Sequence, residues 1–191
     1  MKTDVLDRRV QRTQRVLARA LIDLTLAKGY EALTIRDITE QAEVGYATFF
    51  RHYADKDALL ADVSDVVLAD LLHLLAQPQL DGDPVLVGTL VFQYVQDHSE
   101  LCRVFLSSRG SPALVRRMVE TSTRIMLAEH LPLPGSVVPP EIAAHHLVTA
   151  SIALIQWWLD HDLPLPPERM GIIYAALIAH PTHAVAFQTK G

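Results

Sequence analysis

The segment from Thr34 to Lys56 constrains the fold of this chain more than any other stretch of similar length. Thr34 can cap a short helix, and Asp37 three residues later completes a capping-box arrangement. The apolar residues of that helix fall on one face: Ile35, Ile38 and Ala42. Residues 43–45 predict a tight turn, and a second short helix is expected over 46–52. Two short helices joined by so short a turn must pack against each other at a fixed angle.

This arrangement is a helix-turn-helix, in which the first helix crosses the DNA backbone and the second lies in the major groove. The first turns of the second helix hold the candidates for contacts to base edges: Tyr46, Ala47, Phe49 and Arg51. Tyr46 can hydrogen-bond a base or a phosphate, and Ala47 can contact a thymine methyl group. Packing in the core is an equally good interpretation for Phe49, and it is the favoured one for Phe50.

Charge is distributed unevenly along the chain. Residues 1–60 hold 10 Lys and Arg against 9 Asp and Glu, whereas residues 61–191 hold 7 against 13. The basic residues of the first twenty positions are Lys2, Arg8, Arg9, Arg12, Arg15 and Arg19. A basic leading segment suits a DNA partner, although arginines near a helix end are often simply solvated. The net charge of −5 therefore does not exclude DNA binding.

The rest of the sequence predicts helices. Apolar residues recur at spacings of three, four and seven, and no stretch alternates as a half-buried strand does. The expected helices cover approximately residues 7–28, 34–42, 46–52, 56–77, 84–97, 99–106, 112–131, 141–160 and 168–179. The chain is therefore expected to be all-α with about nine helices, divided into a DNA-binding domain (1–55) and a C-terminal domain (56–191).

The composition bears on the cellular setting. Cys102 is the single cysteine, so no disulfide can form within the chain, which fits a reducing, cytoplasmic environment. The first sixteen residues are charged and lack the apolar segment of a signal peptide. The longest apolar run, 147–159, contains Gln156 and is shorter than a bilayer-spanning helix, so no membrane association is expected.

The last two expected helices, about 141–160 and 168–179, are apolar nearly all round. A helix of that kind must be covered on every side, and the core of its own domain covers only one side. A two-fold homodimer, with both helices of each subunit forming a four-helix bundle, would cover the other. A fully buried central helix in a monomer is the alternative, but a chain of 191 residues has little mass to wrap two such helices.

Residues 8–65 resemble the N-terminal domain of TetR-family transcriptional regulators. The family pattern is T-x-x-x-I-A-x-x-A-G-V-S-x-G-T-x-Y-x-Y-F-x-x-K-x-x-L. The residues in register with it are Thr34, Ile38, Ala42, Val44, Thr48, Phe50, His52, Tyr53, Lys56 and Leu59. The resemblance implies a regulator, by default a repressor, that binds a palindromic double-stranded DNA operator as a dimer. It also implies release from DNA by a small-molecule effector.

Polar residues around the two helices are expected at phosphates: Thr34, Arg36, Thr48, His52, Tyr53 and Lys56. Such contacts fix the register on DNA without reading its sequence. Lys56 also begins a helix, and a helix N-terminus attracts anions. Two residues depart from the family pattern in the turn. Glu43 replaces glycine, at a cost of about 1 kcal/mol if its φ is positive, and Gly45 replaces the serine that caps the recognition helix.

The resemblance further implies a ligand cavity among the C-terminal helices. The candidate lining residues bring polar or aromatic groups to otherwise apolar helices: Tyr94, His98, Cys102, Phe105, Arg109, Met118 and Trp157. Each of them taken alone is more often an ordinary core or surface residue. The alternative is a C-terminal domain that binds a protein partner rather than a metabolite.

Metal binding and catalysis are poorly supported by the sequence. His145 and His146 are adjacent and point to different faces of a helix, and the pair His180 and His183 falls in an expected frayed tail. No Cys/His cluster, phosphate-binding glycine loop or nucleophile motif is present. No metal, cofactor or catalytic residue is therefore expected.

Overall fold

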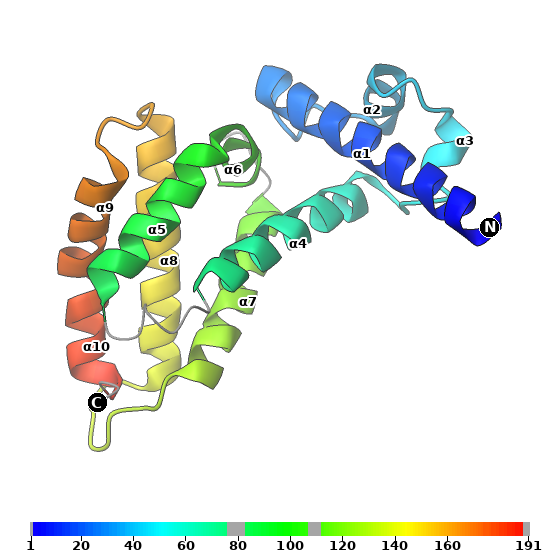
Figure 1. The fold of residues 1–191 in the computed structure, drawn as a ribbon. Coiled ribbons are helices and arrows are strands. Elements are labelled where there is room, and N and C mark those ends of the chain that lie inside the picture. Colours follow the sequence, from blue (N-terminus) through cyan, green and yellow to red (C-terminus); the bar gives the residue numbers. More distant parts are fainter. Residues whose placement is uncertain (1, 76–82, 107–111, 189–191) are drawn as a thin grey trace.

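A computed structural model describes residues 2–75, 83–106 and 112–188 of the chain (Figure 1), and within these ranges it contains helices and no strand longer than a single bridge. The helices are α1 (Lys2–Lys28), α2 (Ile35–Gln41), α3 (Tyr46–Phe49), α4 (Lys56–Leu75), α5 (Pro84–Asp97), α6 (Ser99–Leu106), α7 (Pro112–Glu129), α8 (Pro140–Asp160), α9 (Pro167–Tyr174) and α10 (His180–Ala186). The predicted all-α fold is confirmed.

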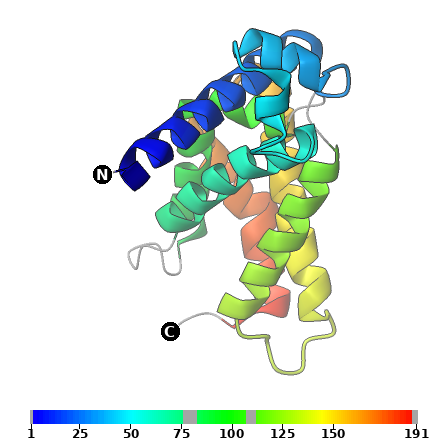
Figure 2. The same cartoon turned by 90° about the vertical axis from the view of Figure 1, so that its right-hand side faces the viewer.

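The helices form two groups. Helices α1, α2 and α3 lie together at one end of the molecule, and α4 leads from them into the group formed by α5 to α10 (Figure 1). Seen from the side, α1, α2 and α3 lie at the upper end of the molecule and α10 lies toward the lower end (Figure 2). The two groups also meet between α1 and α6, where Arg19 lies 3.7 Å from Glu100. The group of α1, α2 and α3 is therefore joined to the larger group by α4 and also contacts it where α1 meets α6.

Each group has its own apolar centre. Leu17 and Leu21 of α1 pack with Ile38 of α2 and Phe49 of α3, all fully buried. In the larger group Trp158 of α8 is fully buried and meets Phe92 of α5 edge to face, with ring centroids 5.1 Å apart. Edge-to-face contact suits two large rings because the positive edge of one meets the negative face of the other.

Two glycines allow α5 and α9 to approach closely. A Cβ atom on Gly171 would lie 2.6 Å from the amide nitrogen of Thr89 and 2.7 Å from the carbonyl oxygen of Val85. A Cβ atom on Gly88 would lie 2.6 Å from the ring of Tyr174. These helices pack backbone to backbone, and the crossing has no room for any larger residue.

The C-terminal segment corrects one expectation from the sequence. The helix expected over 168–179 continues through a π-helical turn (η2, Ala175–Ala179) into α10, so His180 and His183 do not lie in a frayed tail. Pro181 explains the wide turn, because proline has no N–H to donate and its ring would clash with the carbonyl four residues earlier. Phe187 follows α10 and is buried against the rings of His130 and His183.

Helix boundaries differ from the prediction in smaller ways. α1 begins at Lys2 rather than near residue 7, and α3 ends at Phe49 rather than near residue 52.

α8 is long and apolar enough to cross a bilayer by length and composition alone. It packs through buried side chains against the other helices of the larger group, as the central helix of a helical domain does.

Candidate nucleic-acid interface

The N-terminus of α2 is fixed by the predicted capping box. The Thr34 hydroxyl accepts a hydrogen bond from the amide of Asp37 at 3.2 Å, and the Asp37 carboxylate accepts one from the amide of Thr34 at 2.9 Å. Lys28 at the end of α1 lies 3.0 Å from the same carboxylate. The Thr34 hydroxyl and amide, followed by Lys28, lower the pKa of Asp37 to about 2. The capping box is confirmed, and it also connects α2 to α1.

The turn between α2 and α3 adopts a left-handed backbone at Glu43, where φ is 53°. This is the positive φ that glycine takes most easily, so Glu43 costs the turn about 1 kcal/mol. The amide of Val44 donates to the carbonyl of Thr39 at 2.9 Å and closes the turn. Gly45 caps α3 with an extended backbone and no side-chain hydrogen bond, so α3 begins without the usual hydroxyl cap.

An aromatic pair stands on the outer side of α3. Tyr46 is 54% exposed and Phe50, one turn later, is 47% exposed. Their rings meet edge to face with centroids 5.2 Å apart. Ala47 and Arg51 are also exposed and follow these two rings in sequence. Together Tyr46, Ala47, Phe50 and Arg51 form an exposed surface, which we call the reading face.

The aromatic residues of the segment divide differently from the expectation. Phe49 is fully buried against the core of the small group, so it anchors α3 and cannot contact DNA. Phe50, expected in the core, is instead on the reading face. The spacing of four between Tyr46 and Phe50 places them on one side of a helix, and this signal could have identified Phe50 from sequence.

Tyr53 is also an anchor. It is buried, and its hydroxyl donates a hydrogen bond to the Asp62 carboxylate of α4 at 2.7 Å. Burial and the hydrogen bond to Asp62 both raise the pKa of Tyr53. The hydroxyl expected at a phosphate is therefore committed to α4, and it fixes the end of the α3 segment to that helix.

Lys56 has a similar inward role. Its ammonium donates hydrogen bonds to the carbonyl oxygens of Tyr30 and Leu33, each at 3.1 Å. It also lies 4.4 Å from the centre of the Tyr30 ring. The Tyr30 hydroxyl donates to Asp57, the next residue of α4. Lys56 thus joins the loop before α2 to the start of α4, a contact that the sequence motif alone did not suggest.

The remaining predicted DNA contacts lie at or near the surface. Thr34 and Arg36 are exposed at the start of α2. Thr48 and His52 are partly buried beside the reading face. Thr34 and Arg36 thus belong to the start of α2, whereas Thr48, Arg51 and His52 belong to α3 or follow it directly.

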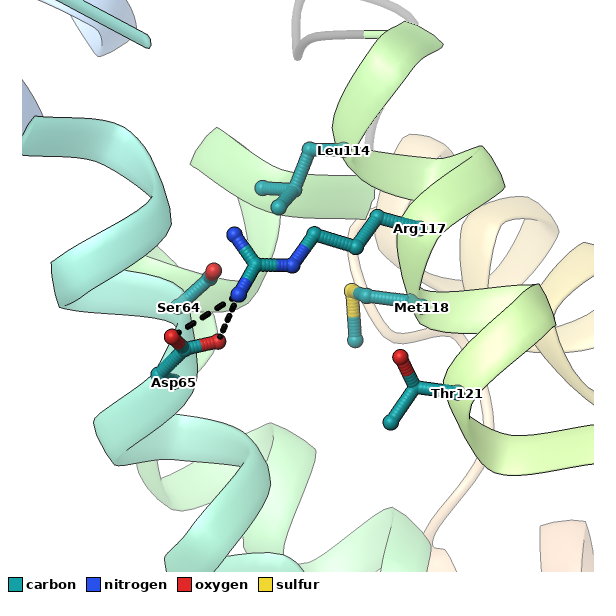
Figure 3. Close-up of a pocket in the computed structure, with 6 residues that line it drawn as sticks. All are labelled: Ser64, Asp65, Leu114, Arg117, Met118 and Thr121. Carbon is teal, nitrogen blue, oxygen red and sulfur yellow. Dashed lines mark hydrogen bonds and ion pairs between the residues drawn. The ribbon is translucent and has the colours of Figure 1, made fainter. Parts of the chain in front are cut away.

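A small cavity lies between α4 and α7 (Figure 3). It is lined by Ser64, Asp65, Leu114, Arg117, Met118 and Thr121, and its volume is about 10 Å³. One guanidinium nitrogen of Arg117 lies 2.9 Å from both carboxylate oxygens of Asp65, which closes the gap between the helices. A volume of that size holds about one water molecule, far less than a site for a drug-sized ligand.

Among the expected ligand-lining residues, Met118 lines this cavity. Cys102 and Phe105 are buried in α6, where desolvation raises the pKa of the Cys102 thiol to about 12. Tyr94 of α5 stacks on His98, the residue that follows α5, with ring centroids 4.2 Å apart. Trp157 is on the exposed side of α8, stacked on His161, so it does not line an interior cavity. Arg109 lies outside the described residues.

Comparison with known proteins agrees with this geometry. The family description "Bacterial regulatory proteins, tetR family" matches residues 18–63, and "Transcriptional regulator C-terminal region" matches residues 88–179. An uncharacterized HTH-type transcriptional regulator of Bacillus subtilis, YxbF, is 38% identical over 172 residues. That match covers 87% of this chain and 44% of YxbF, so the chain spans less than half the length of that relative.

Solved structures share the fold at low sequence identity. A TetR transcriptional regulator from Streptococcus agalactiae has a TM-score of 0.68 and 20% identity, covering 92% of this chain and 98% of that one. NalD of Pseudomonas aeruginosa has a TM-score of 0.67 and 17% identity, covering 94% and 99%. The structures agree in fold, and the two family matches show that the chain belongs to the TetR family of bacterial transcriptional regulators.

Proposed function

We propose that this chain is a repressor that binds a palindromic DNA operator as a homodimer and leaves it when a small molecule binds. The reading face carries this proposal, because α3 exposes Tyr46 and Phe50 while Phe49 and Tyr53 hold the helix from behind. Large exposed aromatic side chains on a short, well-anchored helix are suited to contact with a partner.

We assign two kinds of contact to the DNA-binding residues. Tyr46, Ala47 and Arg51 read base edges in the major groove. Thr34, Arg36, Thr48 and His52 hold phosphates, and the Gly45 amide begins the helix that enters the groove. Lys56 and Tyr53 support these contacts by fixing the position of α3 relative to α4.

The proposed division into residues 1–55 and 56–191 follows the start of α4. The first two turns of that helix nevertheless pack with the DNA-binding residues, because Asp57 and Asp62 bind Tyr30 and Tyr53. The beginning of α4 therefore moves with the helix-turn-helix. A change in the direction of α4 would therefore also change the position of α3.

The homodimer is proposed to form through α8 and the α9–α10 segment, which include the expected ranges 141–160 and 168–179. Exposed apolar side chains lie along both: Ile142, Trp157, Ile172, Leu177 and Val185. Leu177 is 69% exposed although it lies in a segment that is otherwise well packed. An apolar surface over two neighbouring helices suits an isologous interface, in which each copy covers the same surface of the other.

The effector is proposed to enter between α4 and α7, where Arg117 now binds Asp65 (Figure 3). A ligand would have to widen the cavity of about 10 Å³, and the ion pair is the contact that opposes this.

Related structures support a small-molecule effector over a protein partner. NalD is described as the secondary repressor of a multidrug efflux pump. The structure of SmeT, which has a TM-score of 0.62, contains SmeT in complex with triclosan. A cytoplasmic location follows from a DNA target.

The test is selection of DNA from a random pool by the purified protein, followed by fluorescence anisotropy on the selected and on scrambled duplexes at about 150 mM salt. A palindromic sequence bound by two protomers, with at least 10³-fold preference over scrambled DNA, is expected. Tyr46→Ala should remove most of that preference and leave binding to scrambled DNA nearly unchanged. Wild-type protein that enriches no sequence would overturn the proposal.

A further inference from the structure

The N-terminal half of α1 carries arginines that the helix-turn-helix does not use. Arg9, Arg12 and Arg15 are all exposed. They follow one another at intervals of three residues, which places them on one broad side of the helix. The opposite side holds Leu17 and Leu21, which are buried in the core. The arginines therefore face away from the protein.

These three arginines lack acidic neighbours within the described residues. Arg19, one turn further on, is paired with Asp23 at 3.0 Å and lies near Glu100. No described carboxylate pairs with Arg9, Arg12 or Arg15. Like charges three or four residues apart on a helix repel each other, so a helix bearing them is stabilised by an external anion.

The position of α1 relative to the reading face identifies the anion. Gln14 of α1 lies against the hydroxyl of Tyr53, just after α3. Arg9, Arg12 and Arg15 all lie within five residues of Gln14, which is roughly 8 Å along the helix at 1.5 Å per residue. The N-terminal end of α1 and α3 both lie on the side of the molecule away from α9 and α10 (Figure 1). DNA bound at α3 would therefore run past this part of α1.

We propose that Arg12 and Arg15, with Arg9 beside them, bind DNA phosphates outside the base pairs that α3 reads. This rests on the proposed DNA-binding function and extends it by a second contact surface on α1. The stretch from Arg9 to Arg15 spans six residue steps, roughly 9 Å of helix, which corresponds to about three base pairs at 3.4 Å each. The surface adds affinity and lengthens the bound site, and it does not read sequence because guanidinium groups on phosphates carry no base information.

The test compares the double variant Arg12→Gln/Arg15→Gln with wild-type protein. Glutamine keeps helix propensity close to that of arginine, so α1 should remain folded, which circular dichroism checks. The matched control is Arg116→Gln/Arg124→Gln, which removes two exposed arginines of α7. Each protein is titrated by anisotropy over a salt series on the selected duplex with eight flanking base pairs per side, on the same duplex without flanks, and on scrambled DNA.

On the flanked duplex, the salt slope of the α1 variant should fall by about 1.8 per protomer, since each phosphate contact contributes about 0.9. Its affinity near 150 mM salt should drop roughly tenfold or more, with the ranking of sequences unchanged. Removing the flanks should lower wild-type affinity and slope to nearly those of the variant, and should affect the variant little.

A variant that keeps the wild-type slope and affinity on the flanked duplex would overturn the proposal. Equal losses in the α7 control would also overturn it, because they would show an effect of total charge rather than of α1. If wild-type protein shows no sequence preference, the proposed repressor function fails, and the salt slopes on scrambled DNA still decide whether the α1 arginines bind phosphates.

Discussion

At the scale of single residues, the aromatic and basic side chains of residues 46–56 separate into those that face outward and those that support them. Tyr46 and Phe50 are exposed, while Phe49 is buried and Tyr53 donates its hydroxyl to Asp62. Lys56 points inward to two carbonyl oxygens. A basic residue in a DNA-binding motif can therefore act by holding the fold rather than by neutralising a phosphate.

Lys56→Ala should accordingly lower stability before it changes DNA binding. The two carbonyl oxygens would lose a charged donor and the Tyr30 ring would lose its cation, so the free energy of unfolding should fall by about 1–3 kcal/mol. Urea denaturation measures this change. The control is Arg51→Ala, which removes an exposed cation of the reading face and should keep the free energy of unfolding within about 0.5 kcal/mol of wild type. A stable Lys56→Ala protein with a salt slope reduced by about one would instead assign Lys56 to a phosphate.

At the scale of elements, close contacts outside the DNA-binding group fix how the helices of the larger group cross. Gly171 allows α9 to touch the backbone of α5, and the ring of His130, just after α7, contacts His183 of α10 and Phe187 after it. These contacts join segments that are distant in sequence. The sequence indicated α5 and α9 but not α10, and these helix pairings required the structure.

Gly171→Ala should destabilise the protein by about 1–3 kcal/mol. The added methyl group would meet the backbone of Val85 and Thr89, which can yield only if the two helices separate. Thermal unfolding followed by circular dichroism measures the effect, with the exposed Ala113→Ser as the control. An unchanged melting temperature for Gly171→Ala would show that α5 and α9 do not pack this closely in solution.

The cluster of His130, His180 and His183 should make the C-terminal segment less stable in acid. Desolvation first, and then His130 and His180, lower the pKa of His183, so the folded protein favours its neutral form. The stability from this site is present above the unfolded pKa near 6.5 and is lost as pH falls through the lower folded value.

The difference in unfolding free energy between pH 7.5 and pH 5 should therefore be smaller in His183→Asn than in wild type. His73→Asn, at an exposed position of α4, should retain the wild-type dependence. The two pH profiles are measured by urea denaturation. If the unfolding free energies of His183→Asn and wild type fall in parallel with pH, His183 does not cause the acid sensitivity.

At the scale of the whole molecule, the exposed apolar residues of α8 and the α9–α10 segment call for a second copy of the chain. Leu177→Glu should place a charge in the proposed interface and shift the protein toward the 21.2 kDa monomer, because an unpaired buried charge is costly. Light scattering coupled to size exclusion measures the mass. Val137→Glu, at a loop residue that is 95% exposed, should leave the assembly intact. A Leu177→Glu protein with an undiminished dimer would place the interface elsewhere.

The sequence by itself determined the all-α class, the capping box of Thr34 and Asp37, the tight turn at residues 43–45 and the family. These features depend on residues close together in the chain, so local spacing and conformational preference are enough to predict them. Tertiary structure decided that Phe50 faces outward and Phe49 inward, that Lys56 binds two carbonyls, and that residues 180–186 form a helix. Those outcomes depend on which distant segment covers each side chain, and helical periodicity specifies a buried face without specifying what buries it.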